Sequence, residues 1–107
     1  MNDPNAAVDY ILKNAEKFGK AKAARIYLEE FRKTKKALLM AQCTEKAVNA
    51  REQYAYSHPE YQQLLDGLKA AIEVEETIKW HMESARMRVD IWRSHEASNR
   101  NIERVTR

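Results

Sequence analysis

Hydrophobic residues recur at intervals of three and four along most of the chain, which is the spacing of an α-helix with one apolar side. The first stripe of this kind runs from Val8 to Phe18 and predicts a short helix over about residues 4–18. Asp3 and Pro4 suit its start, because aspartate can accept from free backbone N–H groups and proline is tolerated in the first turn. The stripe changes phase at Gly19, where we expect a bend or break.

The next segment favours one long helix over about residues 20–56. It is rich in good helix formers and contains neither glycine nor proline. An alternative stays open at Cys43, because Thr44 followed by Glu45 can begin a new helix there. In that case the long helix would be divided in two.

Ser57-His58-Pro59-Glu60 is the clearest turn signal in the chain. Ser57 can cap a helix with Glu60 three residues later, and Pro59 suits the first turn. We therefore expect a turn at residues 57–59 and a second long helix over about 60–103. Its apolar positions follow the three-four alternation of a coiled coil, interrupted at Glu75. They are Leu64, Leu68, Ala71, Ile78, Met82, Ala85, Val89 and Trp92.

These elements predict a single all-α domain of 107 residues, with a short N-terminal helix and a long, coiled-coil-like antiparallel two-helix hairpin. Two glycines and two prolines leave too little turn chemistry for a β-sandwich, a barrel or a βαβ array. Long helices in a hairpin bury little surface for their size, so a homodimer or higher homo-oligomer is favoured over a monomer.

The formal net charge of +3 conceals three blocks of different sign. Residues 1–37 carry nine basic and five acidic side chains, residues 38–78 carry three and seven, and residues 79–107 carry seven and four. In a hairpin that turns near His58, residues 20–36 would lie beside about residues 79–95. Both basic blocks would then meet at one end, and the acidic block would occupy the other.

Lysines and arginines gathered from two segments are typical of a phosphate-binding surface. The candidate nucleic-acid-binding residues are Lys20, Lys22, Arg25, Arg32, Lys33, Lys35, Lys36, Arg86, Arg93 and Arg100. Nearby aromatic rings that could stack on unpaired bases are those of Tyr27, Phe31, Trp80 and Trp92. One alternative is a solvated face with pairs such as Glu83 with Arg86. Another is that the opposite charges fix the register of an oligomer.

The sequence favours no enzyme, cofactor or metal site. His58, His81 and His95 are too far apart in sequence for a local metal motif, and the single Cys43 excludes an internal disulfide. For Glu75, a salt bridge to Lys35, Lys36 or a partner chain is favoured over a metal. No apolar run approaches the roughly 18 residues of a membrane span, and we expect a cytoplasmic protein.

Three stretches are similar to those of small bacteriophage and prophage proteins from early replication and recombination gene regions. They are residues 27–40 (YLEEFRKTKKALLM), 58–61 (HPEY) and 92–100 (WRSHEASNR). The resemblance implies an accessory role in phage DNA metabolism in the host cytoplasm. The leading hypothesis is therefore a non-enzymatic protein that binds DNA, single-stranded in preference. The alternative is an adaptor or structural helical oligomer that binds protein and no nucleic acid.

Overall fold

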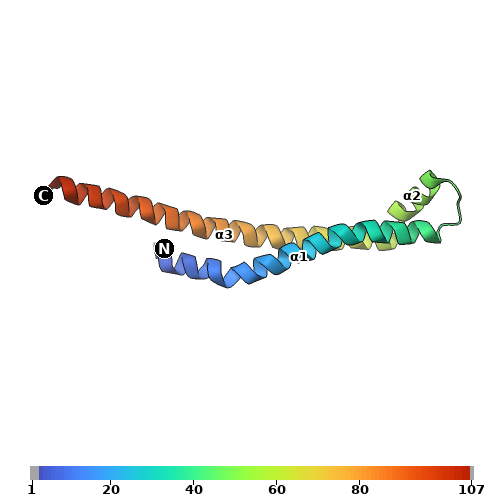
Figure 1. Cartoon of the computed structure of the whole chain (residues 1–107), viewed down its shortest axis with the longest axis horizontal. Coiled ribbons are helices and arrows are strands. Elements are labelled where there is room, and N and C mark those ends of the chain that lie inside the picture. The colour runs from blue at the N-terminus through green and yellow to red at the C-terminus, as the bar shows by residue number, and fades with distance from the viewer. Residues whose placement is uncertain (1–2, 107) are drawn as a thin grey trace. The chain divides into compact units, whose positions relative to one another are not determined.

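The computed structural model describes residues 3–106 and contains three α-helices, with no strand among those residues. Helix α1 spans Pro4–Gln42, α2 spans Val48–Ser57 and α3 spans Pro59–Thr106 (Figure 1). The expected all-helical class is confirmed. The helix boundaries differ from the expected ones at two places, Gly19 and Cys43.

Helix α1 begins as the sequence indicates, because the backbone N–H of Asn5 donates to Asp3 Oδ1 at 2.9 Å. Of the bend or break expected at Gly19, the break is wrong, since α1 continues through it to Gln42. Gly19 has no positive φ and therefore stays in the helical region. A single glycine costs a helix about 1 kcal/mol, which its helix-forming neighbours offset.

The expected single helix over residues 20–56 is divided, as the alternative at Cys43 allowed. Residues 43–47 are outside any helix, and the new helix starts at Val48, later than Thr44. Ala47 precedes it without a side-chain cap. At the end of α1, the backbone carbonyl of Met40 accepts from the N–H of Cys43 and from Arg51 Nε, each at 3.2 Å.

The turn before α3 consists of His58 alone. Pro59 starts α3 as expected, but the cap is His58 rather than Ser57. The backbone N–H of Glu60 donates to His58 Nδ1 at 3.1 Å. The Ser57 hydroxyl instead donates back to the carbonyl of Gln53 at 2.7 Å, because Ser57 is still part of α2.

The contacts divide the chain into two compact units. The terminal unit comprises residues up to Phe18 together with residues from Glu76 onward, and the central unit comprises Gly19–Glu75. The boundary in α1 falls at Gly19, although the helix is not broken there.

All three helices contribute to the core of the central unit. Leu39 of α1 and Ala55 of α2 are fully buried, and Tyr61 of α3 is nearly so. Met40 and Leu65 pack against them. The short α2 therefore packs back near the end of α1 (Figure 1).

The terminal unit has a smaller core. Ala7 of α1 and Ala85 of α3 are buried, and the ring of Tyr10 lies edge-on to that of His81 with centroids 6.5 Å apart. Along α3 the expected apolar stripe is buried or half-buried as far as Val89, whereas Trp92 is exposed.

Candidate nucleic-acid interface

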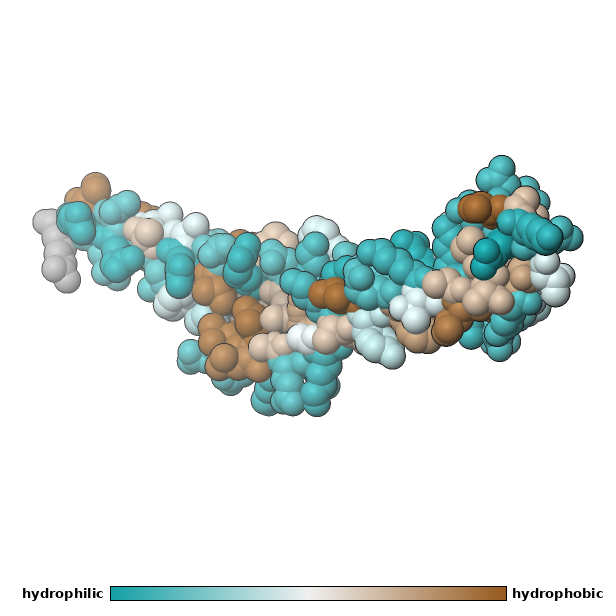
Figure 2. Space-filling view, turned by 45° about the vertical axis from the view of Figure 1, so that its right-hand side comes forward, coloured by the Kyte–Doolittle hydropathy of each residue, from teal (hydrophilic) through white to brown (hydrophobic). Residues whose placement is uncertain are grey.

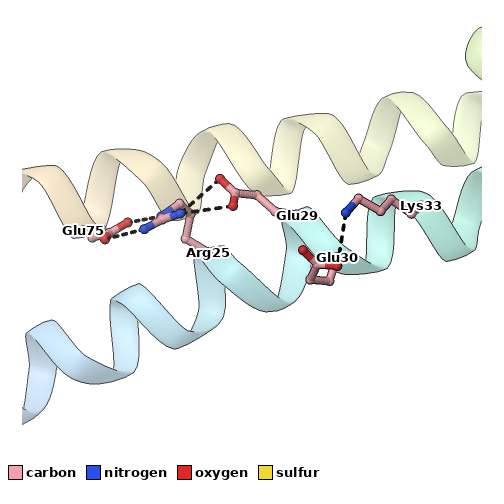
Figure 3. A network of polar contacts seen from close by, with 5 residues as sticks. All are labelled: Arg25, Glu29, Glu30, Lys33 and Glu75. Carbon is pink, nitrogen blue, oxygen red and sulfur yellow. Dashed lines mark hydrogen bonds and ion pairs between the residues drawn. The ribbon is translucent and has the colours of Figure 1, made fainter.

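Arg25, a candidate for phosphate binding, is held by two carboxylates (Figure 3). Its Nη2 donates to Glu75 Oε1 at 3.0 Å, and its Nη1 lies 3.1 Å from Glu29 Oε2. Glu75 keeps only 8 % of its surface exposed. Hydrogen bonding to Glu75 first, and to Glu29 second, raises the pKa of Arg25 above its ordinary value. Arg25 therefore belongs to the packing between α1 and α3.

The partners of Arg25 and Lys35 show that the expected register is wrong. Opposite Arg25 and Lys35 we expected residues near 90 and 80, but the structure pairs them with Glu75 and Glu60. The pairing between α1 and α3 is shifted because α1 ends at Gln42 and α3 starts only at Pro59. The loop at residues 43–47 and the folded-back α2 lie between them in the sequence. Basic α1 thus lies beside the acidic part of α3 in the central unit, rather than beside residues 79–95. Glu75 does form a salt bridge, but its partner is Arg25, and the expected partners Lys35 and Lys36 contact Glu60 and Glu52 instead.

Lys35 and Lys36 also have acidic partners. Lys35 Nζ lies 3.1 Å from Glu60 Oε2, and this contact lowers the pKa of Glu60 below its ordinary value of 4.5. Lys36 Nζ lies 3.6 Å from Glu52 Oε1 and 4.7 Å from the centre of the Tyr56 ring. Hydrogen bonding to Tyr56, aided by Glu52, raises the pKa of Lys36. Lys35 therefore joins α1 to α3, and Lys36 joins α1 to α2.

Other candidates are more accessible. Lys33 contacts Glu30 at 3.4 Å, but both side chains are about 70 % exposed, so solvent screens this pair (Figure 3). Lys20, Lys22 and Arg32 are exposed on α1. Within residues 3–106, Arg32 makes no ion pair.

Three candidates gather around one hollow of about 380 Å³ in the central unit. We call this feature the Tyr56 hollow; its lining residues are Arg32, Lys33, Lys36, Tyr56 and Tyr61. The rings of Tyr56 and Tyr61 meet edge to face with centroids 5.3 Å apart. Tyr61 is buried, whereas Tyr56 is 44 % exposed and presents part of its ring to solvent. Cations and an accessible aromatic ring are thus adjacent.

Sequence reasoning did not single out Tyr56 or Tyr61. The sequence feature that could have indicated them is their position on either side of Pro59, at the turn between α2 and α3. This turn brings both rings close to the basic residues near the end of α1. The aromatic candidates that it did single out lie elsewhere. Tyr27 stacks on Phe31 at 5.9 Å, and Trp80 donates to Glu76 Oε2 at 3.0 Å.

The remaining candidates belong to α3 in the terminal unit. Arg86, Arg93 and Arg100 are exposed and seven residues apart, which places them on one side of α3. We call this the arginine face. Arg86 contacts Glu83 at 3.3 Å, whereas Arg93 and Arg100 make no ion pair with any residue in the described chain. Two of the three arginines of this face therefore make no ion pair within the described residues.

Metal and membrane features receive no support from the structure. No group of three or more histidine, cysteine, aspartate or glutamate side chains within residues 3–106 could hold a metal ion. No described helix is both long enough and apolar enough to cross a membrane.

Comparisons of this chain with protein-family models, curated proteins and solved structures give no match.

Proposed function

We propose that this protein is a non-enzymatic accessory protein that binds single-stranded DNA at the Tyr56 hollow. The observation that supports the proposal is the adjacency of Arg32, Lys33 and the exposed ring of Tyr56. Single-stranded nucleic acid is bound without sequence preference when cations track the phosphates and aromatic rings stack on the bases. The role in phage replication or recombination rests on the resemblance of residues 27–40, which include Arg32 and Lys33.

Each residue has a distinct part in this proposal. Arg32 and Lys33 contact phosphates, because Arg32 has no ion pair within the described residues and Lys33 has only an exposed one. Lys36 holds Tyr56 through its contact with the ring. Tyr56 stacks on a base, which an exposed phenol ring does irrespective of base identity.

Fluorescence anisotropy with single- and double-stranded oligonucleotides at two salt concentrations tests the proposal. The wild-type chain should bind the single strand more tightly and weaken as salt rises. Arg32→Glu with Lys33→Glu should lower the affinity at least about tenfold. It should also reduce the slope of log binding constant against log salt concentration by about 1.4, the value for loss of two phosphate contacts with a single strand. Lys46→Glu with Lys69→Glu is the control, because it changes the net charge equally outside the hollow.

A tyrosine pair separates stacking from charge. Tyr56→Ala should weaken binding by about 1–3 kcal/mol, the worth of one stacked base. Tyr54→Ala is the matched control, since Tyr54 is exposed to a similar degree on the same helix but does not line the hollow. Absence of binding at low salt, or equal loss in both variant pairs, contradicts the proposal.

A second candidate function is that of an adaptor or helical oligomer. Among the described residues, Leu39 is the only large side chain that is fully buried, while many large apolar side chains are exposed. Figure 2 shows such hydrophobic side chains in several places on an otherwise hydrophilic surface. A coiled-coil-like antiparallel hairpin completed by further helices from other copies would cover them.

Light scattering over a range of concentrations tests the second candidate. The expected mass is that of a dimer or larger, and a monomeric mass throughout would contradict self-association. Leu38 is half-exposed on α1, so Leu38→Asp should abolish binding of a co-purifying partner while the isolated protein remains folded and soluble. Retention of the partner by this variant would exclude the Leu38 surface.

A further inference from the structure

Helix α3 carries a second apolar stripe within the terminal unit, away from its buried side. Five exposed apolar side chains point to the same side of α3: at 100° per residue, each lies within about 40° of their common mean direction around the helix axis. They are Trp80, Met87, Ile91, Ile102 and Val105. Their exposed fractions range from 52 % at Met87 to 85 % at Val105. Buried Ala85 is on a different side of the helix, facing Ala7 of α1 across a shared hollow. We call the exposed set the Trp80 stripe.

Acidic side chains border one edge of the Trp80 stripe, and Arg88 with two histidines, which count as neutral in the formal net charge, borders the other. Glu76, Glu83 and Asp90 follow one edge at intervals of seven residues. His81, Arg88 and His95 follow the other edge at the same interval. In heptad terms, Ile91 and Val105 occupy a positions, Trp80 and Met87 occupy d positions, and the acidic and basic edges are the g and e positions, with Ile102 at e. The remaining a and d positions are polar: Ser84, Ser94, Ser98 and Asn101.

We propose that α3 pairs in parallel and in register with α3 of a second copy of this chain along the Trp80 stripe. In a parallel two-stranded coiled coil, each g residue faces the e residue five positions further along the other helix. Glu83 then faces Arg88 of the second copy, and Asp90 faces His95 of the second copy. An antiparallel pairing places g against g and e against e, which brings the acidic edges together and the basic edges together.

Three further observations favour a second copy as the occupant. The stripe from Trp80 to Val105 extends over about 38 Å of helix, which is more than three heptads. Two of the four a positions hold Ile91 and Val105, and β-branched residues at a positions favour two-stranded parallel assemblies. Arg88 is exposed and makes no ion pair within residues 3–106, although it lines two hollows beside Asp3 at the start of α1. Half-exposed Glu83 has only its contact with Arg86, so both side chains can reach a second helix.

This inference rests on the second candidate function, self-association, and not on binding of nucleic acid. The charge-reversal test uses Glu83→Lys and Arg88→Glu in the full chain, measured by analytical ultracentrifugation. Each variant alone places like charges at both symmetric g–e contacts, so its dimer dissociation constant should rise at least about tenfold. An equimolar mixture of the two variants restores opposite charges and should recover a dimer. Circular dichroism confirms that each variant is helical.

Cross-linking tests the orientation. In a Cys43→Ser background, Ser98→Cys places a thiol at an a position, which meets its own equivalent only in a parallel, in-register pair. Oxidised glutathione should then link the chains, whereas Arg93→Cys on the arginine face should remain unlinked.

The outcomes separate this inference from self-association itself. If Ile91→Asp, both charge variants and the wild type dimerise equally, another surface mediates assembly and the inference is overturned. A wild-type chain that stays monomeric at every concentration overturns both the inference and the second candidate. Failure of the mixture to dimerise better than either variant alone contradicts the proposed g–e pairing.

Discussion

At the scale of single residues, the most consequential contact is the one between Arg25 and Glu75. Both occupy inward positions at which a helical pair normally places apolar side chains, and Glu75 is buried. A buried ion pair contributes little net stability compared with apolar residues, but removing Glu75 leaves Arg25 with only the partly exposed Glu29 as its partner. The pair therefore acts mainly on register, because only one alignment of α1 and α3 brings the two charges together.

This argument predicts different results for single and double replacement. Glu75→Leu alone should lower the urea midpoint of unfolding, because Arg25 loses the partner that accounts most for its raised pKa. Arg25→Met combined with Glu75→Leu should recover most of that loss and can exceed the wild-type midpoint. Equal midpoints for the single variant and the wild type would show that the buried contact is dispensable.

The Lys35–Glu60 contact predicts a dependence of stability on acid. Since Lys35 lowers the pKa of Glu60 in the folded chain, the contact stabilises the fold above pH 4.5 and is lost as the pH falls through the lower, folded-state pKa. Glu60→Gln should therefore be less stable than the wild type at pH 7, with the difference shrinking below pH 4.5. Urea titrations between pH 7 and pH 3 measure it. Exposed Glu73→Gln is the control and should change the curve little.

At the scale of the elements, sequence periodicity predicted helices well and their interruptions poorly. Pro4 and Pro59 mark helix starts correctly because proline fixes the backbone locally. Gly19 misled because glycine only lowers helix propensity, and the residues around it restore the helix. The interruption at residues 43–47 contains no glycine or proline to mark it, and it allows Ala55 of α2 to pack against Leu39 of α1.

The interruption between α1 and α2 also explains why the partners expected for Arg25 and Lys35 were wrong. If the chain turned only at His58, residues of α1 would pair with residues of α3 at equal distances from His58. The actual pairing differs because α2 folds back, and the sequence pattern does not predict that. The partners of Arg25 and Lys35 depend on the actual pairing, so neither could be identified from local spacing. The grouping of Arg32, Lys33 and Lys36 was predictable, because they share a short stretch of one helix. Tyr56 joined them only through the packing of α2.

The two helical glycines give a direct test of the element-level argument. A Cβ at Gly19 or Gly67 would meet no atom within 4 Å, and neither has positive φ. A close helix approach therefore does not explain Gly67. Gly19→Ala and Gly67→Ala should each stabilise the protein by about 0.5–1 kcal/mol, as measured by urea denaturation. Destabilisation by either change would indicate a helix that is bent or opposed at that position.

Leu39 provides the corresponding test of the junction of three helices. Leu39→Ala should cost about 2–5 kcal/mol of unfolding free energy, the range for truncation of a buried leucine. The neighbouring Leu38→Ala removes the same atoms from a half-exposed position and should change stability much less. Similar losses at the two positions would place the core on a different side of α1.

At the scale of the whole molecule, burial is unevenly distributed along α3. Tyr61, Leu68 and Glu75 are buried, whereas no residue from Trp92 to Thr106 is. Local opening should therefore be frequent in the last turns of α3 and rare near Tyr61. The same last turns carry part of the Trp80 stripe, the surface proposed to contact a second copy of the chain.

Amide hydrogen exchange at low and high protein concentration measures this distribution. At low concentration, amides of residues 93–106 should exchange fastest within α3, and those of residues 61–75 slowest. Rising concentration should slow exchange along residues 80–105 if the Trp80 stripe is covered by a second copy. Exchange there that is independent of concentration would argue against that surface.

The buried residues Tyr61, Leu68 and Glu75 are spaced seven residues apart along α3. This spacing restricts which insertions and deletions the helix can accept. One inserted codon within α3 rotates every later side chain by about 100°, so Ala85 would turn away from α1 and the arginines would change sides. Seven inserted codons leave the faces nearly aligned. Residues 43–47 lie outside the helices and carry no such phase, so we expect lengths to vary freely in that loop and only in steps of seven within α3.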